Sequence, residues 1–305
     1  MKPFAVTSLL LPVFLTVSQG QPTLQPDPAK QCDDCDAWNQ PLAPFKVFGN
    51  TYYVGTDGLS ALLVTDDAGL ILLDGALPQS APLIDQNIRA LGFRTENVRI
   101  LVNSHAHYDH AGGIAALQRF TKATVAASPA GARALERGGP TEDDPQFGFG
   151  KSQLFPPVKG VRVIADGETL RVGKSAITAH FTPGHTPGAT TWSWQSCEGS
   201  RCLNIVYADS ISAVSAPDYR FTAGPPPTAA DRFRESIAKV EKLPCDILFS
   251  THPSASNMQG KLALRLKSPT PDPFVDSGSC RAYAAAARKR LEDRVAEEAK
   301  TAPKG

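Results

Sequence analysis

The sequence predicts an α/β fold (α+β in some schemes) in which two β-sheets pack together and helices cover their outer faces. Segments with strand patterns and segments with helical patterns alternate twice along the chain. A histidine-rich motif at residues 105–110 follows a buried strand and closes the first half of this order. The chain has 305 residues, 42% of them hydrophobic, as is ordinary for a globular protein.

The N-terminal segment stands apart from this fold. Residues 1–20 combine a basic start at Lys2, an apolar run over 4–17 and small residues at the end, which is the pattern of a secretory signal peptide. The run is too short to span a membrane, and its prolines disfavour the alternative of a buried helix. We therefore expect an exported, soluble protein with a single domain over residues 21–305.

Charge excludes some classes of partner. The chain has 31 Lys and Arg against 30 Asp and Glu, a formal net charge of +1. This balance disfavours nucleic acid and anionic membrane surfaces as partners. We expect a monomer that acts on a small molecule.

In the first half, apolar and β-branched runs predict strands at 47–55, 59–64, 70–75 and 98–102. Apolar residues at helical spacing predict a helix over 81–91, and a second helix should follow Gly112 and Gly113. The motif at 105–110 therefore lies on a strand-to-helix loop, where a rigid scaffold presents side chains to a cleft.

In the second half, the same signals predict further strands at 123–127, 161–164, 176–181, 190–194, 203–207 and 246–250. Helices are predicted at 130–137, 231–243 and 281–300, the last being alanine-rich, charge-paired and on the outside. Residues 142–157 have no periodicity, and a loop of that length in a compact domain is often functional.

Six cysteines in an exported chain are disulfide candidates. Cys197 and Cys202 flank a predicted turn, and Cys245 and Cys280 are the natural second pair. The Cys-x-x-Cys at 32–35 is either a small disulfide loop or two thiols. A redox motif would need a thioredoxin-like βαβ context, which is missing.

The motif at 105–110 places His105, His107, Asp109 and His110 within six residues. Imidazole and carboxylate are ligands that zinc prefers outside thiolate sites. The alternative is a solvated, histidine-rich loop, but the chain has only six histidines and three fall here. We therefore predict a metal site.

The other three histidines lie later in the chain. His185 occupies a tight turn between two predicted strands, and His252 follows the end of another, so both are candidate ligands from elsewhere in the fold. His180 lies within a strand, and we interpret it as structural.

Asp209, Ser210 and Ser212 follow the end of another predicted strand, at 203–207. Asp209 is a candidate to ligate metal or to orient a ligand, and the two serines are candidates to bind substrate. The alternative is a satisfied turn, which Asp and Ser form readily.

The segments HAHYDH (105–110), PGHTPG (183–188), ADS (208–210) and THP (251–253), in this order, resemble the metallo-β-lactamase superfamily. Within it the chain resembles subclass B3 along nearly the whole mature length. The features specific to that subclass are an intact first histidine, serines where other subclasses place a cysteine ligand, the sequence DPQF at 144–147, and the late cysteine pair. One departure is visible: some relatives bridge an N-terminal cysteine to the next hairpin, where this chain has Asp57.

The resemblance implies a four-layer αβ/βα sandwich with two zinc ions at one edge of the sheets. It implies two groups of zinc ligands, which are His105, His107 and His185 for the first ion, and Asp109, His110 and His252 for the second. It also implies Gln146 as a substrate contact beside Ser210 and Ser212.

The expected reaction is hydrolysis of the β-lactam amide bond by a zinc-bound hydroxide, since zinc lowers the pKa of bound water to about 7. We expect Asp109 to bind a zinc ion and to orient the reacting groups, with no covalent acyl-enzyme formed. Such an enzyme would act in the periplasm and confer antibiotic resistance.

Two alternative functions remain. A lactonase or glyoxalase II-like thioesterase would bridge its metals with an aspartate such as Asp209, and a storage protein would bind zinc without catalysis. The signal peptide, the candidate disulfides and the serine pair argue against the first rival.

Overall fold

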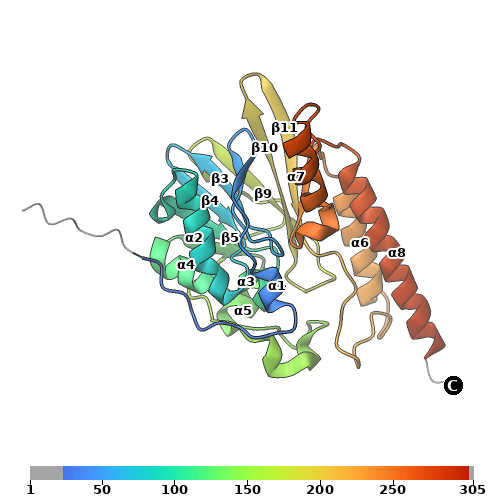
Figure 1. Ribbon diagram of the computed structural model, residues 1–305. Helices are drawn as coiled ribbons and strands as arrows, with labels where there is room; N and C mark the ends of the chain where they lie inside the picture. The colour runs from blue at the N-terminus through green and yellow to red at the C-terminus, as the bar shows by residue number, and fades with distance from the viewer. Residues whose placement is uncertain (1–22, 302–305) are drawn as a thin grey trace, which may run out of the picture.

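The structure is a computed structural model that describes residues 23–301, so the signal peptide predicted at 1–20 lies outside the described residues. Two sheets face each other, and helices cover the outer face of each (Figure 1). The predicted four-layer αβ/βα sandwich is confirmed.

The first sheet has seven strands whose spatial order follows the chain. They are β1 (Phe45–Phe48), β2 (Thr51–Tyr53), β3 (Leu62–Asp66), β4 (Gly69–Leu73), β5 (Val98–Val102), β6 (Thr124–Ala127) and β7 (Arg162–Val163). Neighbours from β1 to β4 pair antiparallel, and neighbours from β4 to β7 pair parallel. Parallel neighbours need crossover connections. The helices in those connections are α2 (Ala81–Ala90), α3 (Tyr108–Ala111), α4 (Ile114–Thr121) and α5 (Pro129–Arg137).

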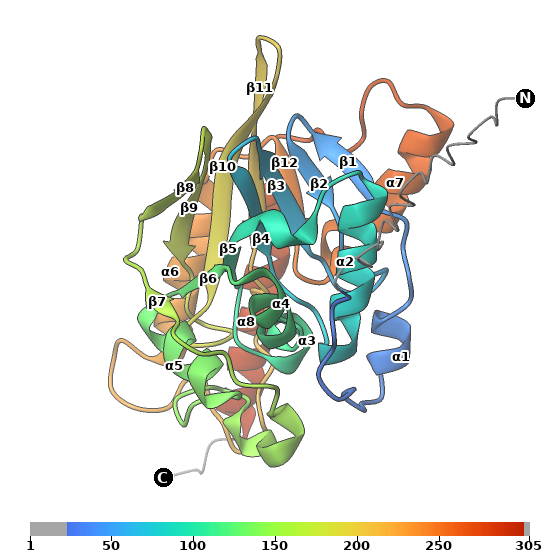
Figure 2. The ribbon, with the colours of Figure 1, turned by 90° about the vertical axis from the view of Figure 1, so that its left-hand side faces the viewer.

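The second sheet has the order β12-β11-β10-β9-β8. Its strands are β8 (Thr169–Val172), β9 (Ser175–Phe181), β10 (Thr190–Glu198), β11 (Arg201–Ala208) and β12 (Ile247–Ser250). All neighbours pair antiparallel except β11 and β12, which are parallel and joined through α6 (Ala229–Lys242). The β10–β11 hairpin projects beyond the rest of the sheet (Figure 2).

Three apolar clusters hold the four layers together. One lies between the first sheet and α2, α4 and α5, and a second lies between the two sheets, around Tyr53, Trp192 and Phe249. The third joins the second sheet to α6 and to α8 (Ser279–Lys300). Strands β4 and β12 are buried along their whole length because both faces of the sheet are covered there, whereas the edge strand β8 alternates between buried and exposed residues.

The structure differs from the sequence-based elements in a few places. The strand expected at 47–55 is a hairpin, because the chain turns at Gly49 with φ +54°. The loop at 142–157 contains a 3₁₀ segment, Phe147–Gln153. Sequence patterns missed β8 and α7 (Met258–Lys267), and α7 buries only Met258, so it has no apolar stripe to detect. The remaining short elements are α1 (Cys35–Trp38) and the 3₁₀ turns Pro78–Ser80, Thr95–Asn97 and Pro253–Ser256.

Three disulfides close loops in the structure. The predicted bonds Cys197–Cys202 and Cys245–Cys280 are confirmed, and the Cys-x-x-Cys forms the small loop Cys32–Cys35. Among residues 23–301, no helix has both the length and the apolar character that a membrane crossing requires.

Candidate metal centre

The histidine-bearing loops meet at one edge of the sandwich. Residues 103–107 follow β5 and lead into α3, which carries Asp109 and His110. The 183–188 turn joins β9 to β10, and residues 209 and 252 lie just beyond the ends of β11 and β12. Two hydrogen bonds join the two sheets here. Thr190 N–H donates to the Ser104 carbonyl (2.7 Å), and the indole N–H of Trp192 donates to the Asn103 carbonyl (3.1 Å). The imidazoles therefore come from a rigid scaffold.

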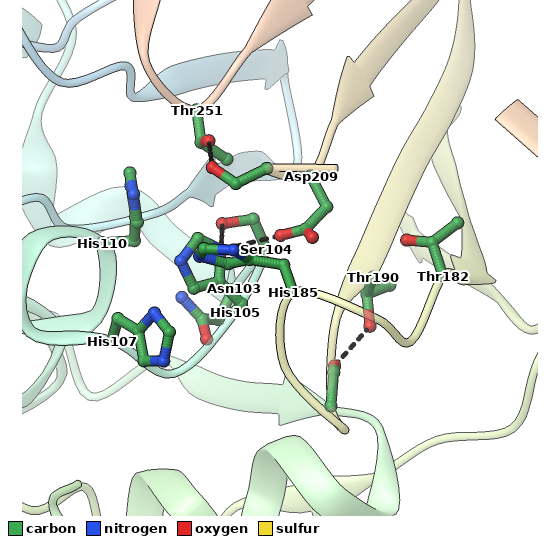
Figure 3. Close-up of polar contacts among 12 residues, drawn as sticks. Asn103, Ser104, His105, His107, His110, Thr182, His185, Thr190, Asp209 and Thr251 are labelled. Atoms are coloured by element: carbon green, nitrogen blue, oxygen red, sulfur yellow. Dashed lines mark hydrogen bonds and ion pairs between the residues drawn. The ribbon is translucent and has the colours of Figure 1, made fainter. Parts of the chain in front are cut away.

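His105, His107 and His185 form the first group. Each offers a ring nitrogen within 4.8 Å of the others, and all three side chains are buried. Figure 3 shows the three rings gathered at the ends of their loops. Nε2 of His105 is buried and has no hydrogen-bond partner in the structure. A buried, unpaired nitrogen facing two other imidazoles is costly unless a ligand satisfies it, so the arrangement fits a metal ion.

In each of these three rings, one nitrogen contacts a carbonyl or carboxylate oxygen of the protein. His185 Nδ1 donates to the Ser212 carbonyl (2.9 Å), and a carbonyl can only accept, so Nε2 keeps its lone pair. His105 Nδ1 lies 2.7 Å from Asp209 Oδ1, and His107 Nε2 lies 3.3 Å from both oxygens of Asp144. Such partners fix the tautomer and the ring orientation of metal ligands.

Asp109, His110 and His252 form the second group. Asp109 Oδ2 lies 3.1 Å from His110 Nε2 and 3.2 Å from His252 Nε2, and the two nitrogens are 3.2 Å apart. Ligand atoms on a tetrahedral zinc ion at roughly 2.0–2.1 Å would be separated by about 3.3 Å. His105 also lies within 4.8 Å of the Asp109 and His110 ligand atoms, so the two groups are adjacent.

The charge states of these residues suit metal binding. Burial, and then the neighbouring His107, lower the pKa of His185 to about 3. Burial, and then His110, hold the pKa of His105 well below its usual value. Burial raises the pKa of Asp109, but His110 and His252 outweigh it, so this pKa lies well below its ordinary value. Near neutral pH, the two imidazoles are uncharged and Asp109 is an anion.

Asp209 orients a ligand rather than joining the ligand groups. Burial lowers the pKa of His105 and raises that of Asp209, so their contact is a hydrogen bond and not an ion pair. The Tyr283 hydroxyl donates to the Asp209 carbonyl (2.8 Å) and Thr191 Oγ1 accepts from its N–H (3.2 Å), which fixes the backbone. Of the two roles that the sequence left open for Asp209, the geometry matches the orienting one.

Sequence reasoning missed Asp74 as part of the site. Its fully buried carboxylate accepts hydrogen bonds from Ser104 N–H (2.7 Å), Ser104 Oγ (2.6 Å), Asn103 Nδ2 (3.0 Å) and the Tyr207 hydroxyl (2.7 Å). Its backbone is left-handed, with φ +63°, which is uncommon for a residue other than glycine. Asp74 thereby holds the loop that enters the histidine motif. The available signal was an aspartate directly after a buried strand and before Gly75.

Trp38 borders the site. It packs against the apolar cluster of the first sheet, and its ring centroid lies 5.2 Å from that of His252. His180 matches its structural interpretation, since Nε2 lies 2.7 Å from Ser193 Oγ across the β9–β10 pair.

Of the three residues expected to contact substrate, two lie beside His185 and the third is bonded to Thr251. Gln146 Nε2 lies 3.4 Å from His185 Nε2, and Ser212 Oγ lies 3.3 Å from His185 Nδ1. Ser210 Oγ is 2.5 Å from Thr251 Oγ1 and largely buried. β11 ends at Ala208, so both serines lie beyond the strand.

Comparisons with known proteins agree with this geometry. A model of the metallo-beta-lactamase superfamily matches residues 54–196. The structure of Rm3 metallo-beta-lactamase has 51% identity, covering 88% of this chain and 99% of that chain, with a TM-score of 0.84. MEM-A1, a subclass B3 metallo-beta-lactamase from a soil metagenome library, has 45% identity, 87% and 100% coverage, and a TM-score of 0.83. A hydroxyacylglutathione hydrolase of Cereibacter sphaeroides is 24% identical over 244 residues, covering 80% of this chain and 81% of that protein.

Proposed function

The chain belongs to the metallo-β-lactamase superfamily and to its subclass B3, and from this premise we propose that it is a zinc-dependent β-lactamase. It hydrolyses the β-lactam amide bond and thereby confers resistance to β-lactam antibiotics. The observation that carries the proposal is the convergence of five histidines and Asp109 in two adjacent groups of ligand atoms.

Two zinc ions fit these groups. The first would be held by His105, His107 and His185, and the second by Asp109, His110 and His252. Three protein ligands per ion leave a position open for water or substrate, which is typical of catalytic rather than structural zinc sites. This argues against a storage protein with the same ligands.

Bound zinc supplies a Lewis acid that polarises the lactam carbonyl and lowers the pKa of water to about 7. The chain supplies orientation and charge. Asp209, Asp144 and the Ser212 carbonyl hold the three rings of the first group. Asp109, the one carboxylate among the six ligands, stays anionic at neutral pH and partly offsets the metal charge. The reaction needs no covalent acyl-enzyme.

Gln146 and Ser212 flank His185 and supply an amide and a hydroxyl beside the first group. β-Lactams carry a carboxylate next to the ring nitrogen, and such donors suit it. Ser210 is the third proposed contact, and it would have to turn from Thr251 to reach substrate.

The nearest alternative is a thioesterase like the similar hydroxyacylglutathione hydrolase, or a lactonase. These enzymes would use Asp209 to bridge the metals. Asp209 instead contacts Nδ1 of His105, and it is in neither three-residue ligand group found among residues 23–301. The β-lactamase proposal therefore accounts for the site better.

Three disulfides fit an oxidising compartment, so the protein is an exported one. We propose that the protein is a soluble monomer in the periplasm, which is the compartment where β-lactams act.

The test is hydrolysis of nitrocefin and of a glutathione thioester by purified mature protein, with elemental analysis of zinc. We expect about two zinc ions per chain and nitrocefin hydrolysis that a chelator abolishes and added zinc restores. Inhibitors that acylate a serine should have no effect. Full activity after chelation, or turnover of the thioester alone, would contradict the proposal.

A further inference from the structure

The C-terminal part of α8 carries a buried carboxylate where its packing pattern calls for an apolar side chain. α8 lies along α6 (Figure 1), and its inward face repeats every three or four residues through Ala284, Ala287 and Leu291. Glu298 lies seven residues after Leu291 on the same face and is only 4% exposed. A buried charge is costly unless it is paired and hydrogen-bonded, so its partners identify what it does.

Glu298 binds the loop that leaves the metal centre. Its Oε1 accepts from Phe221 N–H (2.9 Å), and its Oε2 accepts from Thr222 N–H (3.0 Å) and Thr222 Oγ1 (2.7 Å). Arg294, one helical turn earlier, donates from Nε to Oε1 (2.8 Å) and balances the charge. The carboxylate therefore acts as an anchor for loop backbone.

Arg294 holds the same loop at two other points. Its Nη2 donates to Ser215 Oγ (3.0 Å) and to the Tyr219 carbonyl (2.8 Å), and its guanidinium lies 5.5 Å from the centre of the Phe221 ring. We call Arg294 and Glu298 the α8 clamp. Residues 215–222 are thus fixed by side chains from a helix about eighty residues further along the chain.

The clamped loop connects to the metal centre through the residues that precede it and through a neighbouring loop. It continues from Ser212, whose carbonyl accepts from His185 Nδ1. Ala216 N–H donates to the Pro145 carbonyl (2.8 Å), which joins it to the loop carrying Asp144 and Gln146. Asp144 contacts His107 and Gln146 lies beside His185, so both loops that border the first ligand group meet at this backbone bond.

We propose that Arg294 and Glu298 are positioning residues that set these two loops against the metal centre. Surface loops are normally the mobile parts of a fold. Phe221 packs in the apolar cluster below α6 and its carbonyl accepts from Ala230 N–H (2.9 Å), but the clamp also holds the loop on the side of this anchor that leads to the metal centre. An apolar residue at position 298 would continue the packing of α8 but could not bind the loop amides. The inference rests on the proposed function only for its kinetic readout.

The test compares Glu298→Gln with Glu292→Gln. Both change a glutamate of α8 that pairs with an arginine, but Glu292 pairs with Arg234 of α6 and touches no loop of the site. Glutamine at 298 offers an amide N–H where the loop needs an acceptor. We expect the amides of Ala216, Phe221 and Thr222 to exchange hydrogen about tenfold faster in Glu298→Gln and at the parent rate in the control.

Zinc affinity, measured by competition with a chromophoric chelator, should fall about 3–10-fold in Glu298→Gln, because the Ser212 carbonyl no longer holds His185 firmly. The KM for nitrocefin should rise by a similar factor. Thr222→Val removes one bond to Glu298 and serves as the milder variant if Glu298→Gln does not fold.

A purely structural clamp would lower the melting temperature while Ala216 exchange, zinc affinity and KM stayed at the control values, and that result would overturn the inference. Exchange and zinc affinity do not depend on the substrate. If both change in protein that never hydrolyses nitrocefin, the proposed function fails and the clamp stands.

Discussion

At the scale of single residues, the site depends on groups that hold the ligands as much as on the ligands themselves. Asp209 fixes His105, Asp144 fixes His107, and the Ser212 carbonyl fixes His185. These contacts restrict each ring to one orientation before a metal arrives, and this lowers the entropy cost of binding.

Asp209→Ala tests the orienting role. We expect zinc affinity to fall 10–100-fold, as is typical when the partner of a ligating histidine is removed, with two ions still bound at saturating zinc. Competition titration and elemental analysis measure both quantities. Loss of a whole ion at saturation would instead make Asp209 a ligand, as the thioesterase alternative requires.

The serine pair gives a second prediction at this scale. Ser210→Ala combined with Ser212→Ala should weaken substrate binding by about 0.5–3 kcal/mol per lost hydrogen bond, the upper end applying to a charged partner. KM should rise more than kcat falls, and zinc content should not change. Because Ser210 is bonded to Thr251, we expect Ser212→Ala alone to account for most of the effect. Steady-state kinetics on the double variant and on Ser212→Ala test this, and an unchanged KM in the double variant would remove both residues from the substrate contacts.

At the scale of elements, two disulfides differ in what they join. Cys197 and Cys202 lie opposite each other on the β10–β11 hairpin, which the strand register already pairs. Cys245 and Cys280 join the segment before β12 to the first turn of α8 across 35 residues. The longer loop loses more entropy on closure.

Replacing Cys245 and Cys280 by serine should therefore lower the free energy of unfolding by about 4 kcal/mol, against about 2 kcal/mol for Cys197 and Cys202, in the chain-entropy model. Urea unfolding of the two double variants measures the difference. Equal losses would mean that residual structure in the unfolded chain, rather than loop length, sets the contribution.

At the scale of the whole molecule, buried imidazoles make stability depend on pH. His105 and His185 have lowered pKa values, the latter about 3, whereas an unfolded chain protonates histidine near pH 6.5. The unfolded state therefore binds more protons below pH 6.5, and the stability that these residues contribute above it is lost as the pH falls.

We expect the unfolding free energy of metal-free protein to fall between pH 7 and pH 4, by up to about 1.4 kcal/mol per pH unit for each imidazole. Urea unfolding at several pH values measures the slope. His185→Gln is the control, since it should remove one imidazole's share of it. A slope unchanged in that variant would assign the acid sensitivity to other groups.

Much of the fold and the candidate site is encoded by residues close together in the sequence. Strand and helix patterns, the spacing of His105, His107, Asp109 and His110, and the short Cys197–Cys202 pair can be recognised because each depends on local geometry. The same local rules place His185 and His252 at strand ends, which parallel and hairpin pairing then brings to one edge.

The polar groups that position the ligands and loops of the site could not be predicted in this way, because their partners are far away in the sequence. His105 and Asp209 are 104 residues apart, Asp74 and Tyr207 are 133 apart, and Glu298 lies 77 residues from Phe221. A charged residue near the end of an alanine-rich helix looks solvated, and an aspartate after a strand looks like a turn. The sequence alone identified the candidate metal ligands. Tertiary packing decided which polar groups hold those ligands in place, because burial and pairing depend on how the two sheets and α8 come together.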